Sequence, residues 1–474
     1  MATVVGIAEI VADAAVAGRS NGSTMRLGVQ VTELASGLWV ASELRPDVHG
    51  VALGTWIRVG SRDEEAAQAG VSHLIEHLLF RGSSRYDALS IAETFDRFGS
   101  ELQASTTREE TDLYARVLGE HLPKAVDIIG SMVAAPQFAD IDAEREVVLE
   151  ELALYEDTPD ELVHDVLGEM LFPEQAVGRP IAGYAATVEQ LDQERVVAHH
   201  ARHYTGSQIV IAAAGAIDHD ELVALVEQSF TGLQPAAAPD RVDALPSHGE
   251  ARFVERDTEQ THIAIGGAGI GRQDDRRFAL AVLDQILGGG ASSRLWQEIR
   301  EQRGLVYSVY SYVAYLEETG QVGLALGTRS ENLAEALAIA GHEIAALSRG
   351  QFRDGEIARA RDNLKARLLL NMDSTAARMS RLGRSLISGV DLLADEEVAR
   401  RIDGVTEQGV QELACELFAT DRLCVAGIGP DEGAFNEALE RFRQPFVDGL
   451  RRDRQAVKPQ KSIDRRSSPG EVGT

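Results

Sequence analysis

Two histidines four residues apart, His73 and His77, enclose a glutamate, Glu76, in the stretch HLIEH. Residues three and four apart share one face of a helix, so both imidazoles can point at one ion, as zinc sites on helices require. Glu76 lies on the same face but out of register with the ligands, where its carboxylate can take a proton from a water molecule during metal-assisted hydrolysis. We therefore predict a Zn2+ site with His73 and His77 as ligands and Glu76 as the general base.

The same stretch has two alternative explanations. One is the solvated face of an ordinary amphipathic helix, because apolar residues at helical spacing, from Val71 to Leu78, would form the buried stripe opposite the histidines. A chain of this composition contains an H-x-x-E-H pentapeptide by chance only about a few times in a hundred, and the pattern is a zinc-peptidase signature. The other is a purely structural zinc site, which closes its fourth position with protein and needs no base. We favour the hydrolytic site over both.

A third zinc ligand is expected in the helical stretch 140–157, DIDAEREVVLEELALYED. Glu151 has only apolar neighbours three and four residues away, which places it at the centre of the buried face of this helix, whereas Glu150 is more marginal. These neighbours are Val147, Val148, Leu154 and Tyr155. A carboxylate on a buried face is costly unless it is paired or coordinates a metal. The pattern therefore selects Glu151 as the third ligand.

Glu144 lies seven residues before Glu151 and shares its helix face. The separation is about 10 Å along the helix axis, so both carboxylates cannot easily bind one ion. We interpret Glu144 as support for an imidazole ligand. An equally good explanation is a negative side chain favoured near a helix N-terminus.

The elements around these residues follow from hydrophobic periodicity. Three strands are expected between Leu27 and Gly60, a helix over 69–80, a second helix over 87–98 and a strand pair over 101–118. Helical patterns follow at 119–134 and 141–156.

The second half of the chain repeats this order of a strand, a helix, a strand pair and two helices, with Phe138 and Phe352 at equivalent helix joints. We expect an N-terminal extension at 1–28, a zinc-binding domain at 29–235, a linker at 236–250, a second domain at 251–450 and a polar, disordered tail at 451–474. The second half has LAVLDQILGG in place of the histidine helix, so one zinc ion per chain is expected.

These residues resemble the pitrilysin/insulinase family of inverted-motif zinc peptidases, and within it the short-chain branch that includes the mitochondrial processing peptidase β subunit. HLIEHLLFRG, EREVVLEELALYEDTPDE and LFPEQAVGRPIAGY resemble that branch's first domain, and LDQILGGGASSRLWQEIREQRGLVYSVYSY resembles its second. The resemblance covers residues 28 to 445. It implies an α+β fold of two homologous domains, each an antiparallel or mixed sheet packed with helices on one face, which together form half of a clamshell chamber. It also implies His73, His77 and Glu151 as zinc ligands, Glu76 as base and Glu144 as a distal acidic residue.

The resemblance extends to residues that would contact the substrate. The family pairs an arginine with a tyrosine seven residues later, matched here by Arg300 and Tyr307. A guanidinium can hold a carbonyl or carboxylate, and a phenol can donate to a developing oxyanion. The family's substrate-pairing strand carries Asn-Ala-x-Thr, and this chain has Gln103, Ala104, Ser105 and Thr106. Strand addition uses backbone groups and survives the change, but the asparagine side-chain contact does not carry over.

The resemblance implies a zinc-dependent endopeptidase that cleaves peptides or extended polypeptide segments bound as an edge strand inside a chamber. Family members build that chamber from four such domains, and this chain supplies two. We therefore expect a homodimer, or a heterodimer with a related chain, in which Arg300 and Tyr307 serve the zinc site of the other subunit. The alternative is a non-catalytic scaffold or assembly subunit of a heterodimer. Such members usually lose a ligand or the base, and all four positions are present here.

Composition limits the other classes of function. The net charge of −29 argues against a nucleic-acid-binding protein, and it would attract basic ligands if it were concentrated in a cavity. No run of eighteen apolar residues is present, so no membrane span is expected. The N-terminus lacks the basic segment of a signal peptide, so we expect a cytoplasmic protein.

Overall fold

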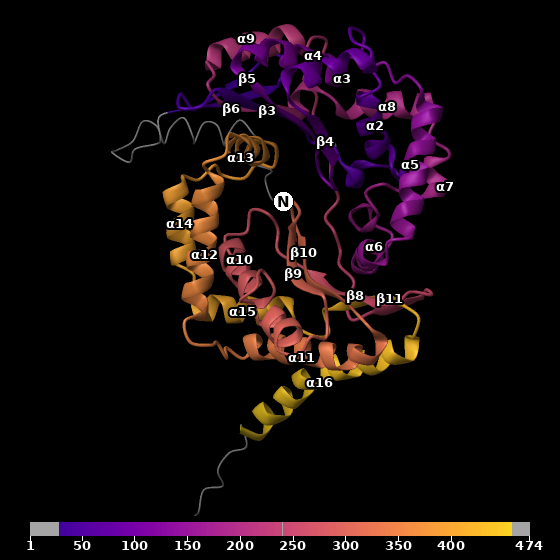
Figure 1. Cartoon of the computed structure of the whole chain (residues 1–474), viewed down its shortest axis with the longest axis vertical. Coiled ribbons are helices and arrows are strands. Elements are labelled where there is room, and N and C mark those ends of the chain that lie inside the picture. The colour runs from indigo at the N-terminus through magenta and orange to yellow at the C-terminus, as the bar shows by residue number, and fades with distance from the viewer. Residues whose placement is uncertain (1–27, 239, 457–474) are drawn as a thin grey trace, which may run out of the picture.

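The computed structural model describes residues 28–238 and 240–456 (Figure 1). It contains two β-sheets, each packed with helices, one from each half of the chain. The expected N-terminal extension before Gly28 lies outside the described residues, as does the tail after Ala456. Helix α16 (Glu432–Ala456) extends beyond residue 451, where the tail was expected to begin.

The first sheet has six strands in the order β1-β2-β6-β3-β5-β4. The β2–β6 pair is parallel and the other pairs are antiparallel. The strands expected between residues 27 and 118 are confirmed. The six strands of the sheet are β1 (Val29–Glu33), β2 (Trp39–Leu44), β3 (Gly50–Ile57), β4 (Leu102–Thr106), β5 (Thr111–Leu118) and β6 (Ile209–Gly215). The strand β4 therefore lies at an edge and pairs with β5 alone.

Amphipathic helices cover the outer face of this sheet, as Figure 1 shows. Leu74, Ile75 and Leu78 of α2 are fully buried against the sheet, which leaves the histidine face of α2 turned away from the core. The expected helices are confirmed, although α4 begins at Leu122, three residues later than expected. The helices of this half are α2 (Val71–Leu79), α3 (Ala88–Phe98), α4 (Leu122–Ala134), α5 (Ile141–Glu156), α6 (Pro159–Leu171), α7 (Ala185–Val188), α8 (Gln193–His203) and α9 (His219–Ser229).

The second sheet has five strands in the order β7-β11-β8-β10-β9, with β9 at an edge. Its elements follow the order of the first half, and α5 and α12 each have sixteen residues. The strands are β7 (Ala251–Glu255), β8 (Thr261–Ala268), β9 (Ser308–Tyr315), β10 (Gly320–Thr328) and β11 (Cys424–Gly429). The helices before α16 are α10 (Arg277–Leu287), α11 (Ser330–Ser348), α12 (Glu356–Asn371), α13 (Thr375–Ile387), α14 (Asp395–Asp403) and α15 (Glu407–Leu417).

The two halves exchange one helix each. Helix α13 of the second half packs on the inner face of the first sheet, where Met379 and Leu382 contact the face that carries Trp56. Helix α6 of the first half packs in the same way on the second sheet. The expected fold of two helix-covered sheets is confirmed, but each sheet also carries a helix from the other half on its second face. This second helix has an apolar surface to pack on, because alternate side chains of a strand point to opposite faces and both faces of these strands are apolar. Gly383 permits the contact, since a Cβ there would lie 2.1 Å from the Trp56 ring.

A cluster of ion pairs joins the halves where they meet. Arg62 pairs with Glu109 and with Glu318 of the β9–β10 turn, at 2.9 Å for Glu318. Arg241, from the stretch expected to be a linker, donates to both carboxylate oxygens of Asp63 at 2.8 Å. Four of these side chains are almost completely buried, so their charges are well shielded from water. The segment around Arg62 is therefore fixed by the second half.

Among the helices of the described ranges, none combines the length and the apolar character needed to cross a membrane.

Candidate active site

His73, His77 and Glu151 converge from two helices of the first half. His73 and His77 lie on α2, and Glu151 lies on the neighbouring α5. The Glu151 Oε2 atom is 3.7 Å from His73 Nε2 and 3.5 Å from His77 Nε2. Ligand atoms about 2.0–2.1 Å from a tetrahedral zinc ion are separated by about 3.4 Å, so the two distances to Glu151 suit such an ion. All three ligand atoms lie within 4.8 Å of one another. The two nitrogens and one carboxylate oxygen are also a donor set that zinc accepts.

The structure places Glu151 beside the two histidines, but not for the reason that led to its prediction as a ligand. Sequence analysis put Glu151 at the centre of a buried helix face, but Val147, Leu154 and Tyr155 are 45%, 68% and 40% exposed. Glu151 therefore does not lie on a buried face, because α5 lies at the surface and buries few residues, among them Glu144 and Val148. Position 151 faces α2 because α5 crosses that helix there.

Glu144 occupies the buried position that had been expected for Glu151. Its side chain is 4% exposed, and Glu144 Oε2 is 3.5 Å from His77 Nδ1, the nitrogen on the far side of the ring from Glu151. Arg81 also pairs with Glu144. A carboxylate at this nitrogen can fix the tautomer and the orientation of a histidine ligand.

Glu76 is held by a residue of the edge strand. Thr106 Oγ1 at the end of β4 donates a hydrogen bond of 2.6 Å to Glu76 Oε2. Burial raises the pKa of Glu76, and the hydrogen bond from Thr106 and the charge of His77 oppose that rise. A carboxylate with a raised pKa accepts a proton more readily near neutral pH. Sequence analysis gave no role to Thr106, because only the strand pairing brings it to α2.

His73 differs from His77 in its surroundings. Its Nδ1 atom is buried and has no hydrogen-bond partner among the described residues. Burial lowers the pKa of His73, with Glu151 opposing and His77 adding to the effect, which favours the neutral imidazole that can bind a metal. The orientation of the His73 ring therefore depends on the backbone of α2 and on packing.

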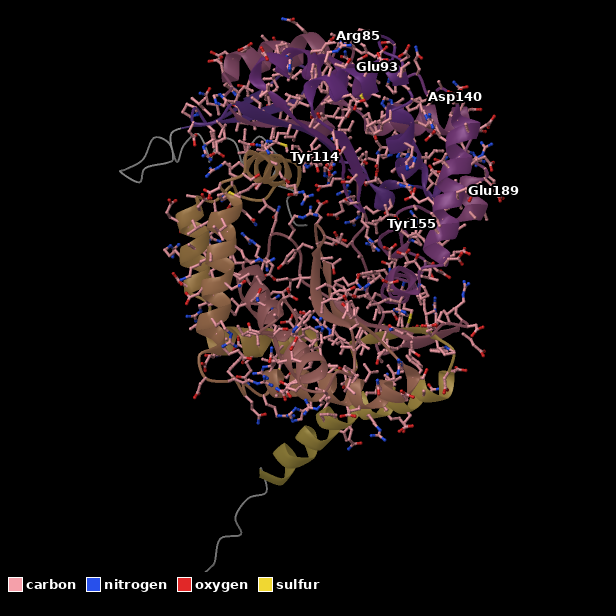
Figure 2. All side chains as sticks on the ribbon, in the orientation of Figure 1. Arg85, Glu93, Tyr114, Asp140, Tyr155 and Glu189 are labelled. Atoms are coloured by element: carbon pink, nitrogen blue, oxygen red, sulfur yellow. The ribbon has the colours of Figure 1, made fainter. Side chains whose placement is uncertain are left out.

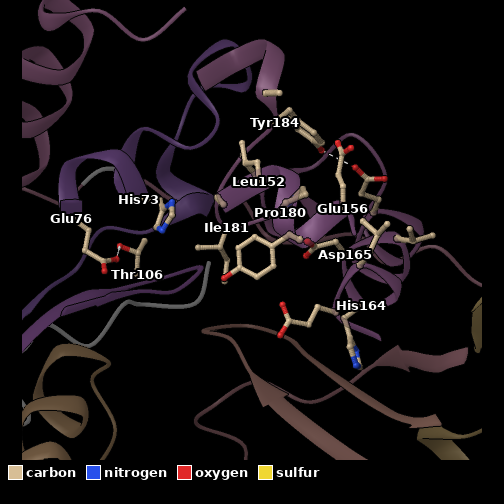
Figure 3. Close-up of a pocket in the computed structure, with 18 of the residues that line it drawn as sticks. His73, Glu76, Thr106, Leu152, Glu156, His164, Asp165, Pro180, Ile181 and Tyr184 are labelled. Atoms are coloured by element: carbon tan, nitrogen blue, oxygen red, sulfur yellow. Dashed lines mark hydrogen bonds between the residues drawn. The ribbon is translucent and has the colours of Figure 1, made fainter. Parts of the chain in front are cut away.

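A cavity of about 610 Å³ begins at His73 and Glu76. His73, Glu76 and Thr106 lie at one end, and His164 and Asp165 lie at the other (Figure 3). Every residue that lines it falls between 73 and 185, so it belongs to the first half. Figure 2 places Tyr155, which also lines it, on the side of this half that faces the second half.

The far end of the cavity is acidic. Its lining includes the side chains of Glu156, Glu161, Asp165 and Glu169. Burial raises the pKa of Asp165, and the nearby charges of Glu169 and Glu161 raise it further, whereas Arg108 lowers it. Sequence analysis missed this feature, although the run of acidic residues from Glu156 to Asp165 was a visible signal.

The edge strand contributes two of its three expected substrate contacts to the cavity. Ala104 and Ser105 line it together with Thr106. Gln103 does not: its side chain accepts a hydrogen bond from Tyr114 and donates one of 3.2 Å to Glu101. Among the described residues β4 pairs with β5 alone, so the backbone on its outer side can pair with an added strand.

Arg300 and Tyr307 lie in the second half and do not line the cavity. Arg300 belongs to a short π-helical segment, Trp296–Glu301 (η6), and its guanidinium stacks 3.8 Å from the centre of the Trp296 ring. It also lies 5.5 Å from the centre of the Tyr307 ring. Tyr307 is 82% exposed. The structure therefore brings Arg300 and Tyr307 to each other but not to the histidines of the same chain.

The fold and the site define a protein of two helix-covered sheets with a candidate metal centre in the first half. Two family models match the chain in turn: Insulinase (Peptidase family M16) over residues 39–184 and Peptidase M16 inactive domain over residues 190–364. The chain belongs to peptidase family M16.

Bacterial relatives support the same family. An uncharacterized zinc protease of Streptomyces coelicolor is 37% identical over 412 residues, which is 85% of this chain and 90% of the relative. An uncharacterized zinc protease of Mycobacterium tuberculosis is 38% identical over 84% of this chain and 92% of the relative. One of Bacillus subtilis is 34% identical over 81% of this chain and 95% of the relative.

Solved structures share the fold. A protease from Helicobacter pylori superposes with a TM-score of 0.79 at 18% identity, covering 85% of this chain and 99% of that chain. A peptidase M16 inactive domain from Pseudomonas fluorescens superposes with a TM-score of 0.80 at 23% identity, covering 85% and 99%.

Proposed function

We propose that this chain is a zinc-dependent endopeptidase that cleaves peptides or extended polypeptide segments. The observation that supports it best is the convergence of His73, His77 and Glu151 beside a cavity that His73 and Glu76 line. A zinc ion bound by these three ligands would polarise the scissile carbonyl and lower the pKa of a water molecule. Relatives with the name zinc protease agree with this proposal.

The protein's own residues have separate tasks in this reaction. Glu76 Oε1 or Oε2 takes the proton from the attacking water and later passes it to the leaving amine. Thr106 holds the carboxylate of Glu76 in place through its hydroxyl. Glu144 keeps the His77 ring oriented, with Nε2 toward Glu151.

The substrate binds as an added strand along β4. Edge backbone groups give affinity without reading sequence, and Ala104 and Ser105 then lie beside the bound chain. The acidic end of the cavity favours a basic substrate side chain, because Glu161 and Asp165 would lie within its reach.

We further propose that the active unit is a homodimer, or a heterodimer with a related chain, in which Arg300 and Tyr307 serve the partner's site. The exposed Tyr307 is free to donate to a developing oxyanion there. This arrangement would give the second half a role although it lacks a histidine pair.

The alternative is a non-catalytic scaffold or assembly subunit. The match to the family's inactive domain does not favour it, because that match begins at residue 190, after every candidate residue of the first half. The description "inactive domain" therefore applies to the part of the chain that has no candidate zinc ligand.

Metal content and peptide cleavage separate the two. We expect the purified chain to hold one zinc ion and to cleave a mixed peptide library, and the Glu76→Gln variant to retain the zinc ion but lose cleavage. Glu150→Gln changes an exposed carboxylate of α5 and is the matched control, with wild-type cleavage expected. Zinc binding without cleavage by the wild-type chain and its dimer would support the scaffold. Cleavage unchanged in Glu76→Gln would refute the proposed mechanism.

A further inference from the structure

The helix that carries His73 and His77 begins without a capping side chain of its own. Its N-cap residue is Gly70, in a left-handed conformation with φ 96°. A Cβ at Gly70 would lie 2.5 Å from the carbonyl oxygen of Ala182, in a loop that lines the cavity. The serine, threonine and aspartate residues that usually cap a helix are therefore excluded at this position.

A carboxylate from outside the helix takes the place of the cap. Glu64 Oε2 accepts a hydrogen bond of 2.8 Å from the backbone N–H of Gly70, and Glu64 Oε1 accepts one of 2.8 Å from Ser72. The first N–H groups of a helix have no partner within it, and a negative charge there is favoured by the helix dipole. Glu64 therefore fixes the first turn of α2, and Ser72 directly precedes His73.

The carboxylate is held there against a considerable cost. Glu64 is 5% exposed, and its burial raises its pKa to about 7, against the hydrogen bonds from Ser72 and Gly70. A buried carboxylate that only filled space would be replaced at no loss by an apolar residue. Glu64 instead offers two acceptor oxygens, and backbone N–H groups at the start of α2 bond to both of them.

A role for Glu64 follows from the difference between the two histidines. A histidine that binds a metal usually donates its second ring nitrogen to a carboxylate or carbonyl, which sets the ring's orientation. His77 has Glu144 at its Nδ1, but His73 has no hydrogen-bond partner at Nδ1 among the described residues. The His73 ring is consequently oriented by the backbone of the first turn, which Glu64 holds.

We infer that Glu64 is a positioning residue for His73, and that it links the candidate metal helix to the second half of the chain. The inference rests on the proposed function. Glu64 follows Arg62 and Asp63, which pair with Glu318 and Arg241 at the junction of the halves. The second half thereby anchors the segment from which Glu64 reaches α2.

The segment that contains Glu64 also holds one wall of the cavity. Arg179 Nη2 donates a hydrogen bond of 2.6 Å to the backbone carbonyl of Glu64, and the loop from Pro180 to Ala185 follows it directly along the cavity. One short segment therefore fixes the start of the metal helix, one wall of the cavity and the junction with the second half.

The test compares Glu64→Gln and Glu64→Ala with Glu65→Gln in the full chain. Glu65 is the neighbouring carboxylate, 69% exposed, and is the matched control. Zinc affinity is measured by competition with a chelating indicator, and hydrogen exchange of the Gly70 and Ser72 amides is measured in the metal-free chain. We expect Glu64→Gln to weaken zinc binding about 10-fold and Glu64→Ala to weaken it further. We also expect faster exchange at these two amides, lower kcat with little change in KM, and wild-type behaviour of Glu65→Gln.

Each outcome decides the inference. A residue that served stability alone would change the unfolding temperature and leave zinc affinity, kcat and amide exchange in the folded chain unaltered, which would overturn it. Glu64→Gln preserves side-chain size and carries the test if Glu64→Ala does not fold. If the wild-type chain bound no zinc, the proposed function would fail, and amide exchange would still decide whether Glu64 caps α2. Normal zinc binding in both Glu64 variants, with cleavage abolished in Glu76→Gln, would overturn the inference and leave the proposed function standing.

Discussion

The hydroxyl of Thr106 donates a hydrogen bond of 2.6 Å to the carboxylate of Glu76. Thr106 is the last residue of β4, the edge strand along which a substrate strand can add, and Glu76 lies on α2 between the two histidines. The strand that would hold the peptide thus also holds the proposed base. A substrate docked on β4 and the proton acceptor are therefore positioned by one element.

This contact predicts a selective loss of turnover when the hydroxyl is removed. Thr106→Val keeps the shape of the side chain but leaves Glu76 without its donor. A hydrogen bond to a charged group contributes about 1.5–3 kcal/mol, so we expect kcat to fall about 10- to 100-fold. KM should change little, because the β4 backbone is unaltered. Steady-state kinetics on one cleaved peptide measures both, and Thr106→Ser, which keeps the hydroxyl, should stay near wild type. Equal kcat values for Thr106→Val and wild type would contradict a role in holding the base.

The sequence was sufficient for the elements of the fold because hydrophobic periodicity reports which face of an element is buried. It predicted α2 and α5 and the strand pair β4–β5 close to their observed bounds. It did not predict that α6 and α13 cross to the opposite sheets, since a helix with an apolar face gives no sign of which sheet covers it. Such pairings depend on the three-dimensional path of the chain.

The residues of the candidate site were also predictable only in part. The spacing of His73, Glu76 and His77 is local, so a helix alone brings them onto one face. Glu151 was selected by an argument about burial that the structure does not support, and Glu144 is the buried residue instead. The roles of Thr106 and Glu64 could not be predicted from the sequence, because each residue contacts α2 only through tertiary packing. The family resemblance, and not the periodicity of α5, was the stronger support for Glu151.

Stability at acidic pH should depend on His200. Its Nε2 lies 2.9 Å from the carbonyl oxygen of Val133, and burial lowers the pKa of His200 to about 4, which the Val133 contact partly opposes. The unfolded chain binds a proton near pH 6.5 and the folded chain does not, so folding stability falls as the pH drops from 6.5 toward 4. At pH 5 this amounts to about 2 kcal/mol in the free energy of unfolding.

Urea unfolding at pH 7.5 and pH 5.0 measures this effect, with EDTA present so that the candidate zinc ligands do not contribute through bound metal. We expect His200→Gln to lose less stability than wild type between the two pH values. His342→Gln alters an imidazole that is 66% exposed and should behave like wild type. An identical loss in His200→Gln and wild type would show that His200 does not titrate as described.

The acidic end of the cavity should select basic side chains. Glu161→Gln combined with Asp165→Asn removes two negative charges there without a large change in shape. We expect kcat/KM for peptides with arginine to fall about 10-fold, and kcat/KM for otherwise equal peptides with norleucine to stay constant. The difference should shrink at high ionic strength, because salt screens charges in a solvated cavity. Glu189→Gln, on the outer surface in Figure 2, is the control. An equal loss for both peptides would point to damage of the cavity and not to charge recognition.

Tyr307 provides the sharpest test of how subunits cooperate. Its side chain is 82% exposed and lies away from the cavity of its own chain, so Tyr307→Phe should leave folding and zinc content intact. If Tyr307 serves the partner's site, both Tyr307→Phe and Glu76→Gln should be impaired as homodimers.

A mixed dimer would then contain one site with both an intact base and an intact tyrosine. We expect co-expression with two different affinity tags to yield mixed dimers that recover up to about half of wild-type activity, since one of two sites is complete. Recovery depends on assembly, so a mixed dimer confirmed by its two tags but inactive would rule out action between subunits. Full activity of the Tyr307→Phe homodimer would remove Tyr307 from the mechanism altogether.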